Sequence, residues 1–364
     1  MEKDQSNLQN LQNLQNFHNS NEISIFKSTD NLPWIEKYRP HTLNNIIAHT
    51  DIINTLKIFI KNKCLPHLLL YGPSGTGKTS TIMACAEELY GEYYPFMVME
   101  LNASDDRGIE VVRSKIKQFV TSKNVFFGKN PEERNGIFKL VILDEADAMT
   151  DDAQAILRKV VEKYTTTTRF CLICNYIQNI NPALQSRCTR FRFAPINKSN
   201  MKLKTMEIIE KEKIDITEQG IDTIIRRSNG DMRKVLNNLQ SVSMAYSKID
   251  EKNVNICLGY PRKTHIEYIM NHLINEPFST TYMNITDIKK KNGLSLTDII
   301  REIHDILICC ILENKYQYEY IKKLDMEKIS RILDELRIVE FNQSVNTTES
   351  IQLSAMIAIF KKVL

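Results

Sequence analysis

Residues 72 to 79 have the residue types and spacing of a phosphate-binding loop, and they follow a short apolar run. The glycines let the backbone curl tightly and turn its N–H groups toward phosphate oxygens. A helix predicted to start near Lys78 adds the positive end of its dipole. Lys78 can reach the β- and γ-phosphates, and the Thr79 hydroxyl can ligate Mg²⁺. The sequence therefore predicts a site for a nucleotide and Mg²⁺ at Gly72, Pro73, Ser74, Gly75, Thr76, Gly77, Lys78 and Thr79.

An acidic pair follows the apolar run 138–143. Asp144 and Glu145 stand where this predicted strand ends, which is the edge at which α/β sheets bind ligands. Asp144 is placed to hold Mg²⁺, directly or through water. Glu145 is placed to orient and deprotonate an attacking water. The alternative is a plain acidic loop after a strand, which the phosphate-binding motif at 72–79 makes much less favoured. The pair therefore predicts nucleotide hydrolysis.

Three further polar residues each allow two interpretations. Asn175 ends an apolar strand, where it either positions water or the γ-phosphate or is an ordinary turn residue. Arg233 lies in the first turn of a helix and opposes its dipole, which favours an anionic partner; the alternative is a salt bridge with Asp231. Arg187 is either stabilised by the end of its own short helix or reaches a neighbouring subunit's nucleotide.

Strand and helix patterns alternate from about residue 32 to 196. Strands are predicted at 67–71, 96–101, 138–143, 169–174 and 190–193. Helices are predicted at 50–62, 78–90, 107–120, 151–164 and 182–187. Short apolar strands that alternate with helices are typical of a parallel sheet covered by helices, so we expect an α/β fold here.

The remaining segments differ in character. Residues 1–30 are rich in Asn and Gln and are predicted to be a disordered tail. From about 197 to 259 the strand signal stops and three or four helices fit, one of them capped by Asn229 or Asp231. From about 262 onward nearly everything is helical. Two apolar stripes there are predicted to be core: Ile299, Ile300, Ile303, Ile306 and Leu307, and Ile351, Leu353, Met356, Ile357 and Phe360.

Net charge, the length of apolar runs and the cysteine content limit which class of protein this chain can be. The chain has 364 residues and a formal net charge of +4, which is too small to indicate nucleic-acid binding by itself. No apolar run reaches 18 residues and the N-terminus lacks a signal pattern, so we expect an intracellular protein with no membrane span. The eight cysteines are scattered and predicted to be core residues. Cys171 and Cys174 have CxxC spacing, for which zinc or redox use is the less favoured alternative.

The motifs together resemble the small subunits of replication factor C, the eukaryotic sliding-clamp loader, which is a AAA+ ATPase. The resemblance runs from about residue 32 to the C-terminus and rests on segments 34–40, 72–79, 101–109, 144–147, 186–188 and 230–233. Other segments are similar to the family branch numbered five in animals and three in budding yeast, namely 31–34, 65–71, 146–150 and 169–176.

The resemblance implies a fold and a complex. It implies a AAA+ RecA-like parallel sheet domain at 31–196, a small helical lid domain at 197–260 and an all-α collar domain at 261–364. Such a chain joins four other replication factor C subunits in a heteropentamer in the nucleus. The complex uses ATP and Mg²⁺ to open the sliding clamp, proliferating cell nuclear antigen, and to load it on primer–template DNA for DNA replication and repair.

The resemblance also assigns roles to matching positions. Asn102 corresponds to the residue that restrains Glu145 until DNA is bound. Asn175 corresponds to sensor 1 and Arg233 to sensor 2. Arg187 corresponds to the finger that completes the next subunit's site in trans. The segment beside the adenine comprises Tyr38, Arg39 and Pro40.

DNA and clamp contacts are also expected from the resemblance. The basic candidates for sequence-independent contact with DNA phosphates are Arg107, Arg113, Lys117, Arg158 and Lys159. The alternative for each is an ordinary solvated charged face. Phe126 and Phe127 are candidates for a hydrophobic pocket of the clamp, and the alternative is packing of their loop on the sheet.

Two other functions remain open. One is a different AAA+ DNA-remodelling motor, which would be expected to show pore-loop aromatics or a winged-helix C-terminus. The other is a scaffold subunit that binds ATP structurally without hydrolysing it. Glu145 and Arg187 favour catalysis over the scaffold.

Overall fold

A computed structural model describes residues 32–104, 112–122, 138–313, 321, 324–345 and 348–364. Its largest sheet is five-stranded, with the order β2-β3-β4-β1-β5, and all its pairings are parallel. The strands are β1 (Leu68–Tyr71), β2 (Val98–Asn102), β3 (Lys139–Asp144), β4 (Thr168–Cys174) and β5 (Thr189–Arg192). The predicted α/β class is therefore confirmed, and every predicted strand lies within two residues of its observed bounds.

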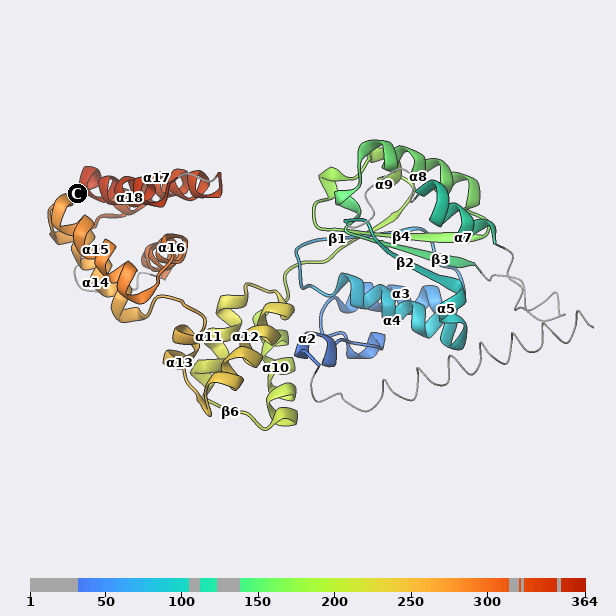
Figure 1. Cartoon of the computed structure of the whole chain (residues 1–364), viewed down its shortest axis with the longest axis horizontal. Coiled ribbons are helices and arrows are strands. Elements are labelled where there is room, and N and C mark those ends of the chain that lie inside the picture. The colour runs from blue at the N-terminus through green and yellow to red at the C-terminus, as the bar shows by residue number, and fades with distance from the viewer. Residues whose placement is uncertain (1–31, 105–111, 123–137, 314–320, 322–323, 346–347) are drawn as a thin grey trace, which may run out of the picture. The chain divides into compact units, whose positions relative to one another are not determined.

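Helices cover both faces of the sheet (Figure 1). One face carries α3 (Thr50–Lys61), α4 (Lys78–Tyr90) and α5 (Tyr94–Met97). The other carries α7 (Lys117–Thr121), α8 (Asp151–Tyr164) and α9 (Pro182–Gln185). Successive side chains of one strand enter opposite cores, since Leu68 and Leu70 join the first and Leu69 the second. Burial on both sides explains why the strands read as continuous apolar runs.

The described chain forms two compact units. The first combines residues up to Lys213 with Ile224–Gln240, and the second combines Ile214–Thr223 with Ser241–Leu364. The predicted lid segment 197–260 is shared between the units, and its bounds stay a prediction. Its helices are α10 (Lys198–Glu212), α11 (Glu218–Ser228), α12 (Met232–Ala245) and α13 (Glu251–Cys257).

The expectation of no strands after residue 197 was wrong. Strands β6 (Asp215–Ile216) and β7 (Lys248–Ile249) form a small parallel pair in the second unit. Each strand has only two residues, which is too short to produce a period-two pattern in the sequence.

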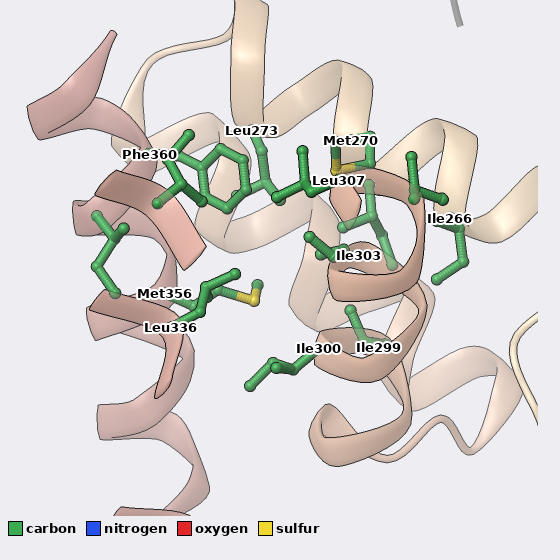
Figure 2. Packing of buried hydrophobic residues seen from close by; sticks show 14 of the residues in the cluster. Ile266, Met270, Leu273, Ile299, Ile300, Ile303, Leu307, Leu336, Met356 and Phe360 are labelled. Carbon is green, nitrogen blue, oxygen red and sulfur yellow. The ribbon is translucent and has the colours of Figure 1, made fainter. Parts of the chain in front are cut away.

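The second unit has its own apolar core (Figure 2). It is built by α14 (Lys263–Asn275), α15 (Phe278–Asn292), α16 (Leu296–Glu313), α17 (Met326–Ser344) and α18 (Glu349–Val363). The predicted stripe of α16 is buried, as are Leu353, Met356, Ile357 and Phe360 of α18. Ile351 was wrongly placed in that stripe, because its side chain is 61% exposed while Gln352 is buried.

Candidate nucleotide site

The loop 72–79 leaves β1 and enters α4 at the carboxyl edge of the sheet. Gly72 has a φ of 144°, and a Cβ placed on it would lie 2.0 Å from the carbonyl oxygen of Phe193. Only glycine fits this approach between the loop and the end of β5. The local fold therefore follows from the glycine spacing, and it places the loop where a parallel sheet binds ligands.

Lys78 is the buried cation of the site. Its Nζ lies 2.7 Å from the carbonyl oxygen of Gly72, 2.8 Å from that of Pro73 and 3.0 Å from Oδ1 of Asn175. Burial lowers the pKa of Lys78, the Asp144 carboxylate opposes this shift, and the Arg233 charge adds to it. Because Lys78 contacts neutral oxygens and lies near the positive charge of Arg233, this position favours an anionic ligand.

Thr79 and Asp144 provide oxygen atoms beside Lys78 that could act as metal ligands. The Thr79 hydroxyl donates to Oδ2 of Asp144 over 2.7 Å. Among the described residues no cluster of three or more His, Cys, Asp or Glu side chains is arranged to hold a metal. A hydroxyl and one carboxylate nevertheless fit Mg²⁺, which takes few protein ligands and completes its shell with water and phosphate oxygens.

Glu145 follows Asp144 at a strained position. Its φ is 52°, in the left-handed region that non-glycine residues rarely adopt, and its N–H donates to Oδ1 of Asp144 over 2.9 Å. Strain of this kind clusters at functional sites. Asn102 pairs with Asp144 in the register of β2 and β3. Its side-chain oxygen accepts hydrogen bonds from the N–H and the hydroxyl of Ser104.

Asp147 was not assigned a role from the sequence. Its Oδ2 accepts the backbone N–H groups of Asn175, over 3.2 Å, and Tyr176, over 3.0 Å. Asp147 therefore fixes the backbone of the residue whose side chain meets Lys78. The available signal was its position, two residues after Glu145 in the same acidic segment.

A cavity of about 430 Å³ adjoins the loop within the first unit. Its volume suits a small-molecule ligand. One wall is Gly75, Thr76 and Gly77, and the others include Arg233, Met232, Leu236, Tyr38, Arg39, Pro40 and Ile208. The predicted adenine-side segment and Arg233 thus line the same cavity as the loop.

Glu212 anchors the adenine-side segment and was also missed from the sequence. Its carboxylate accepts the Tyr38 hydroxyl and lies 2.6 Å from Nζ of Lys37. Burial and this hydrogen bond raise the pKa of Tyr38. Glu212 is the last residue of α10, so no local pattern linked it to a residue more than 170 positions earlier.

Arg187 lies two residues after the end of α9 and does not line the cavity beside the loop. Its guanidinium is 2.5 Å from a carboxylate oxygen of Glu162 and donates to the carbonyl oxygen of Ala183. Glu162 also accepts a hydrogen bond from Arg158, which with the Arg187 charge lowers the pKa of Glu162. The trans-acting candidate is thus paired with a partner on α8.

The remaining candidates are placed only in part. Lys117 on α7 is exposed, as are Arg158 and Lys159 on α8. Arg113 lies in the π-helix η4 (Val112–Ile116), where its side chain is not described. Arg107, Phe126, Phe127 and the tail 1–30 lie outside the described residues.

Cys171 and Cys174 are buried free thiols of β4. Burial raises the pKa of Cys174 to about 12, so its thiol stays protonated and packs as an apolar group. Of the helices with described positions, none combines the length and apolarity that crossing a membrane requires.

Comparisons with known proteins agree with this architecture. The family model for the ATPase family associated with various cellular activities (AAA) matches residues 68–196. The model for the replication factor C C-terminal domain matches residues 261–359. The chain also resembles Thermotoga maritima RuvB, the Holliday junction branch migration motor, with a TM-score of 0.49, 14% identity and coverage of 79% of this chain and 91% of that one. That similarity is too low to bear on function.

Curated relatives match almost the whole chain. Human replication factor C subunit 5 is 49% identical over 91% of this chain and 92% of its own length. The probable replication factor C subunit 5 of Dictyostelium discoideum is 46% identical, with 92% of each chain covered. Replication factor C subunit 3 of Schizosaccharomyces pombe is 44% identical with the same coverage. The chain therefore belongs to the replication factor C family, in the group whose members are numbered 5 in human and 3 in fission yeast.

Proposed function

We propose that this chain is an ATPase subunit of a heteropentameric clamp loader in the nucleus. In this role it binds and hydrolyses ATP so that the complex opens the sliding clamp and loads it on primer–template DNA. The observation that carries the proposal is the convergence of Lys78, Thr79, Asp144 and Asn175 at one sheet edge. Membership in the replication factor C family supports ATP as the substrate, and the other subunits, the sliding clamp and DNA as the partners.

Each residue has a part in the proposed reaction. The loop N–H groups and Lys78 bind the phosphates, and Tyr38, Arg39 and Pro40 flank the adenine. Glu145 takes a proton from the attacking water as the water oxygen bonds in line to the γ-phosphorus, while the bond from that phosphorus to the β,γ-bridging oxygen breaks and ADP leaves. Lys78 and Arg233 stabilise the charge that develops on the phosphoryl oxygens. Asn175 positions the water, and Asp147 holds Asn175 in place.

Thr79 and Asp144 would hold Mg²⁺, which when bound neutralises phosphate charge. Asn102 would restrain Glu145 before DNA binds. It neighbours Asp144 on the adjacent strand, which supports this assignment. Arg187 would leave its own site untouched and act in the next subunit.

The helices at the end of the chain support assembly with other subunits. Ile338 and Phe341 of α17, Val345 directly after that helix and Ile351 in the first turn of α18 are 48%, 66%, 61% and 61% exposed. We call these four residues the terminal apolar face. Apolar residues gathered on a surface are typical of protein contacts.

The test of catalysis replaces Glu145 by Gln in the full chain, reconstituted with the other four subunits, the clamp and primed DNA. Loss of the general base is expected to slow clamp loading at least tenfold while ATP affinity stays within about threefold of wild type. Glu92→Gln, an exposed acid in η3 (Gly91–Tyr93), is the matched control.

Lys78→Ala separates the alternatives in the same assay. If clamp loading survives Glu145→Gln but is lost with Lys78→Ala, this chain binds ATP only as a scaffold. If neither change affects loading, the site has no role in the reaction and the proposal fails.

A further inference from the structure

The start of α12 contacts the phosphate-binding loop directly. The Ser74 hydroxyl donates to Oδ2 of Asp231 over 3.1 Å. The N–H of Met232 donates to the carbonyl oxygen of Gly75 over 3.1 Å. These residues belong to the same compact unit, although more than 150 positions separate them in the sequence.

Asp231 is held on its other side by the helix that carries Arg233. Its Oδ1 accepts the N–H of Arg233 over 2.9 Å and that of Lys234 over 3.3 Å, so it caps α12. The residue is only 8% exposed. One buried carboxylate thus joins the loop hydroxyl to the first turn of α12.

The packing at this junction leaves no space for a side chain. Gly75 has a φ of 66°, and a Cβ built on it would lie 1.6 Å from Oδ1 of Asp231. The loop meets α12 through a side chain, a carbonyl and a Cα, and none of these contacts uses a loop N–H. The junction with α12 therefore occupies none of the loop N–H groups, although the N–H of Gly72 donates to the carbonyl oxygen of Cys174.

We propose that Ser74 and Asp231 form a brace that positions Arg233 relative to the phosphate-binding loop. This inference rests on the proposed function, in which Arg233 meets the γ-phosphate. Asp231 is a positioning residue, because it acts through the loop and the helix and not on the reacting atoms. When the loop binds the phosphates of the nucleotide, the brace holds Arg233 at a fixed position, where it meets the γ-phosphate. Because ADP has no γ-phosphate, the brace raises the affinity for ATP more than the affinity for ADP.

The test measures binding by the full-length chain with Mg²⁺, using isothermal titration calorimetry. The ligands are ADP and a non-hydrolysable ATP analogue with a β,γ-imido bridge. Ser74→Ala removes the loop hydroxyl at an exposed position, so folding is expected to survive. The Kd of the ATP analogue should rise at least threefold more than the Kd of ADP. In an Arg233→Met background, Ser74→Ala should produce no such difference between the ligands.

Ser228→Ala is the matched control, because Ser228 lies shortly before α12 and has a buried hydroxyl. That hydroxyl donates to the carbonyl oxygen of Ile224 and not to the loop. It should not change the ratio of the two Kd values. If Ser74→Ala weakens both ligands equally or neither, the brace is overturned and the proposed function stands. If the wild-type chain binds neither ligand, the proposed function fails and this inference fails with it.

Discussion

At the scale of single residues, three of the proposed nucleotide contacts are each supported by a carboxylate that does not itself contact the nucleotide. Glu212 and Asp147 are distant in sequence from the residues they support, whereas Asp231 lies two residues before Arg233. Asp147 holds the backbone of Asn175, Glu212 holds Tyr38, and Asp231 caps the helix of Arg233. Such support fixes the rotamers and positions that a reaction needs. Removing a supporting carboxylate should therefore impair the site without removing any group that contacts ATP.

His67 provides a pH-dependent test at this scale. Its Nδ1 accepts the backbone N–H of Phe170 over 3.1 Å, which requires the neutral imidazole. Burial, with the nearby Arg169 charge, lowers the pKa of His67 to about 4 from an ordinary value of 6.5. Between these pH values the unfolded chain binds the extra proton. The free energy of unfolding should therefore fall, by roughly 1 to 2 kcal/mol, as the pH drops from 6.5 to 4.

Urea denaturation of wild type and His67→Asn across this pH range measures the effect. An Asn side-chain oxygen can still accept the Phe170 N–H but does not titrate, so the variant should lose stability less steeply. His304→Asn, at an exposed histidine, should keep the wild-type slope. Equal slopes for wild type and His67→Asn would contradict the assignment.

At the scale of elements, Lys139 joins a strand to a helix on the far side of the sheet from α4. It begins β3 with only 4% exposure. Its Nζ lies 2.7 Å from the carbonyl oxygens of Phe119 and Ser122 and from the Ser122 hydroxyl, at the end of α7. A cation at a helix C-terminus satisfies carbonyls that have no partner within the helix.

Lys139→Met keeps the aliphatic stem and removes the ammonium. The charge-assisted hydrogen bonds to Phe119 and Ser122 are lost, so the free energy of unfolding should fall by about 1 to 3 kcal/mol. Chemical denaturation checks this against Lys159→Met, an exposed lysine of α8 whose replacement should cost less than about 0.5 kcal/mol. A loss no larger than that of the control would show that the ammonium contributes nothing to stability.

At the scale of the whole molecule, the nucleotide cavity and the terminal apolar face belong to different compact units with separate cores. Assembly and nucleotide binding should therefore respond to different substitutions. Phe341→Glu places a charge at the most exposed side chain of the terminal apolar face. It should weaken association with the other subunits at least tenfold, because burying an unpaired carboxylate is costly.

Affinity capture with the four co-expressed subunits measures association, and calorimetry measures ATP binding, which should be unchanged. Met326→Glu is the matched control, since Met326 is also exposed on α17 but lies outside the terminal apolar face. Undiminished capture of the Phe341→Glu chain would exclude this face as the contact surface.

The sequence by itself determined the parallel α/β class, the five strands of the large sheet to within two residues, and the glycine-rich loop between β1 and α4. Local rules set these features: strands buried on both faces are continuously apolar, and a tight loop around phosphate needs glycines at fixed positions. Family resemblance supplied the proposed role of Asn102 and favoured one of the two interpretations that the residues left open for Arg187 and for Arg233.

Only the tertiary structure decided which carboxylates support the site, that Ser74 meets Asp231, and that Ile351 is exposed while Gln352 is buried. The pair of two-residue strands β6 and β7 was likewise invisible in the sequence. The physical reason is that these features depend on contacts between distant segments. A hydrogen bond across 157 positions leaves no periodic pattern, since its partners are brought together by the packing of α12 against the loop.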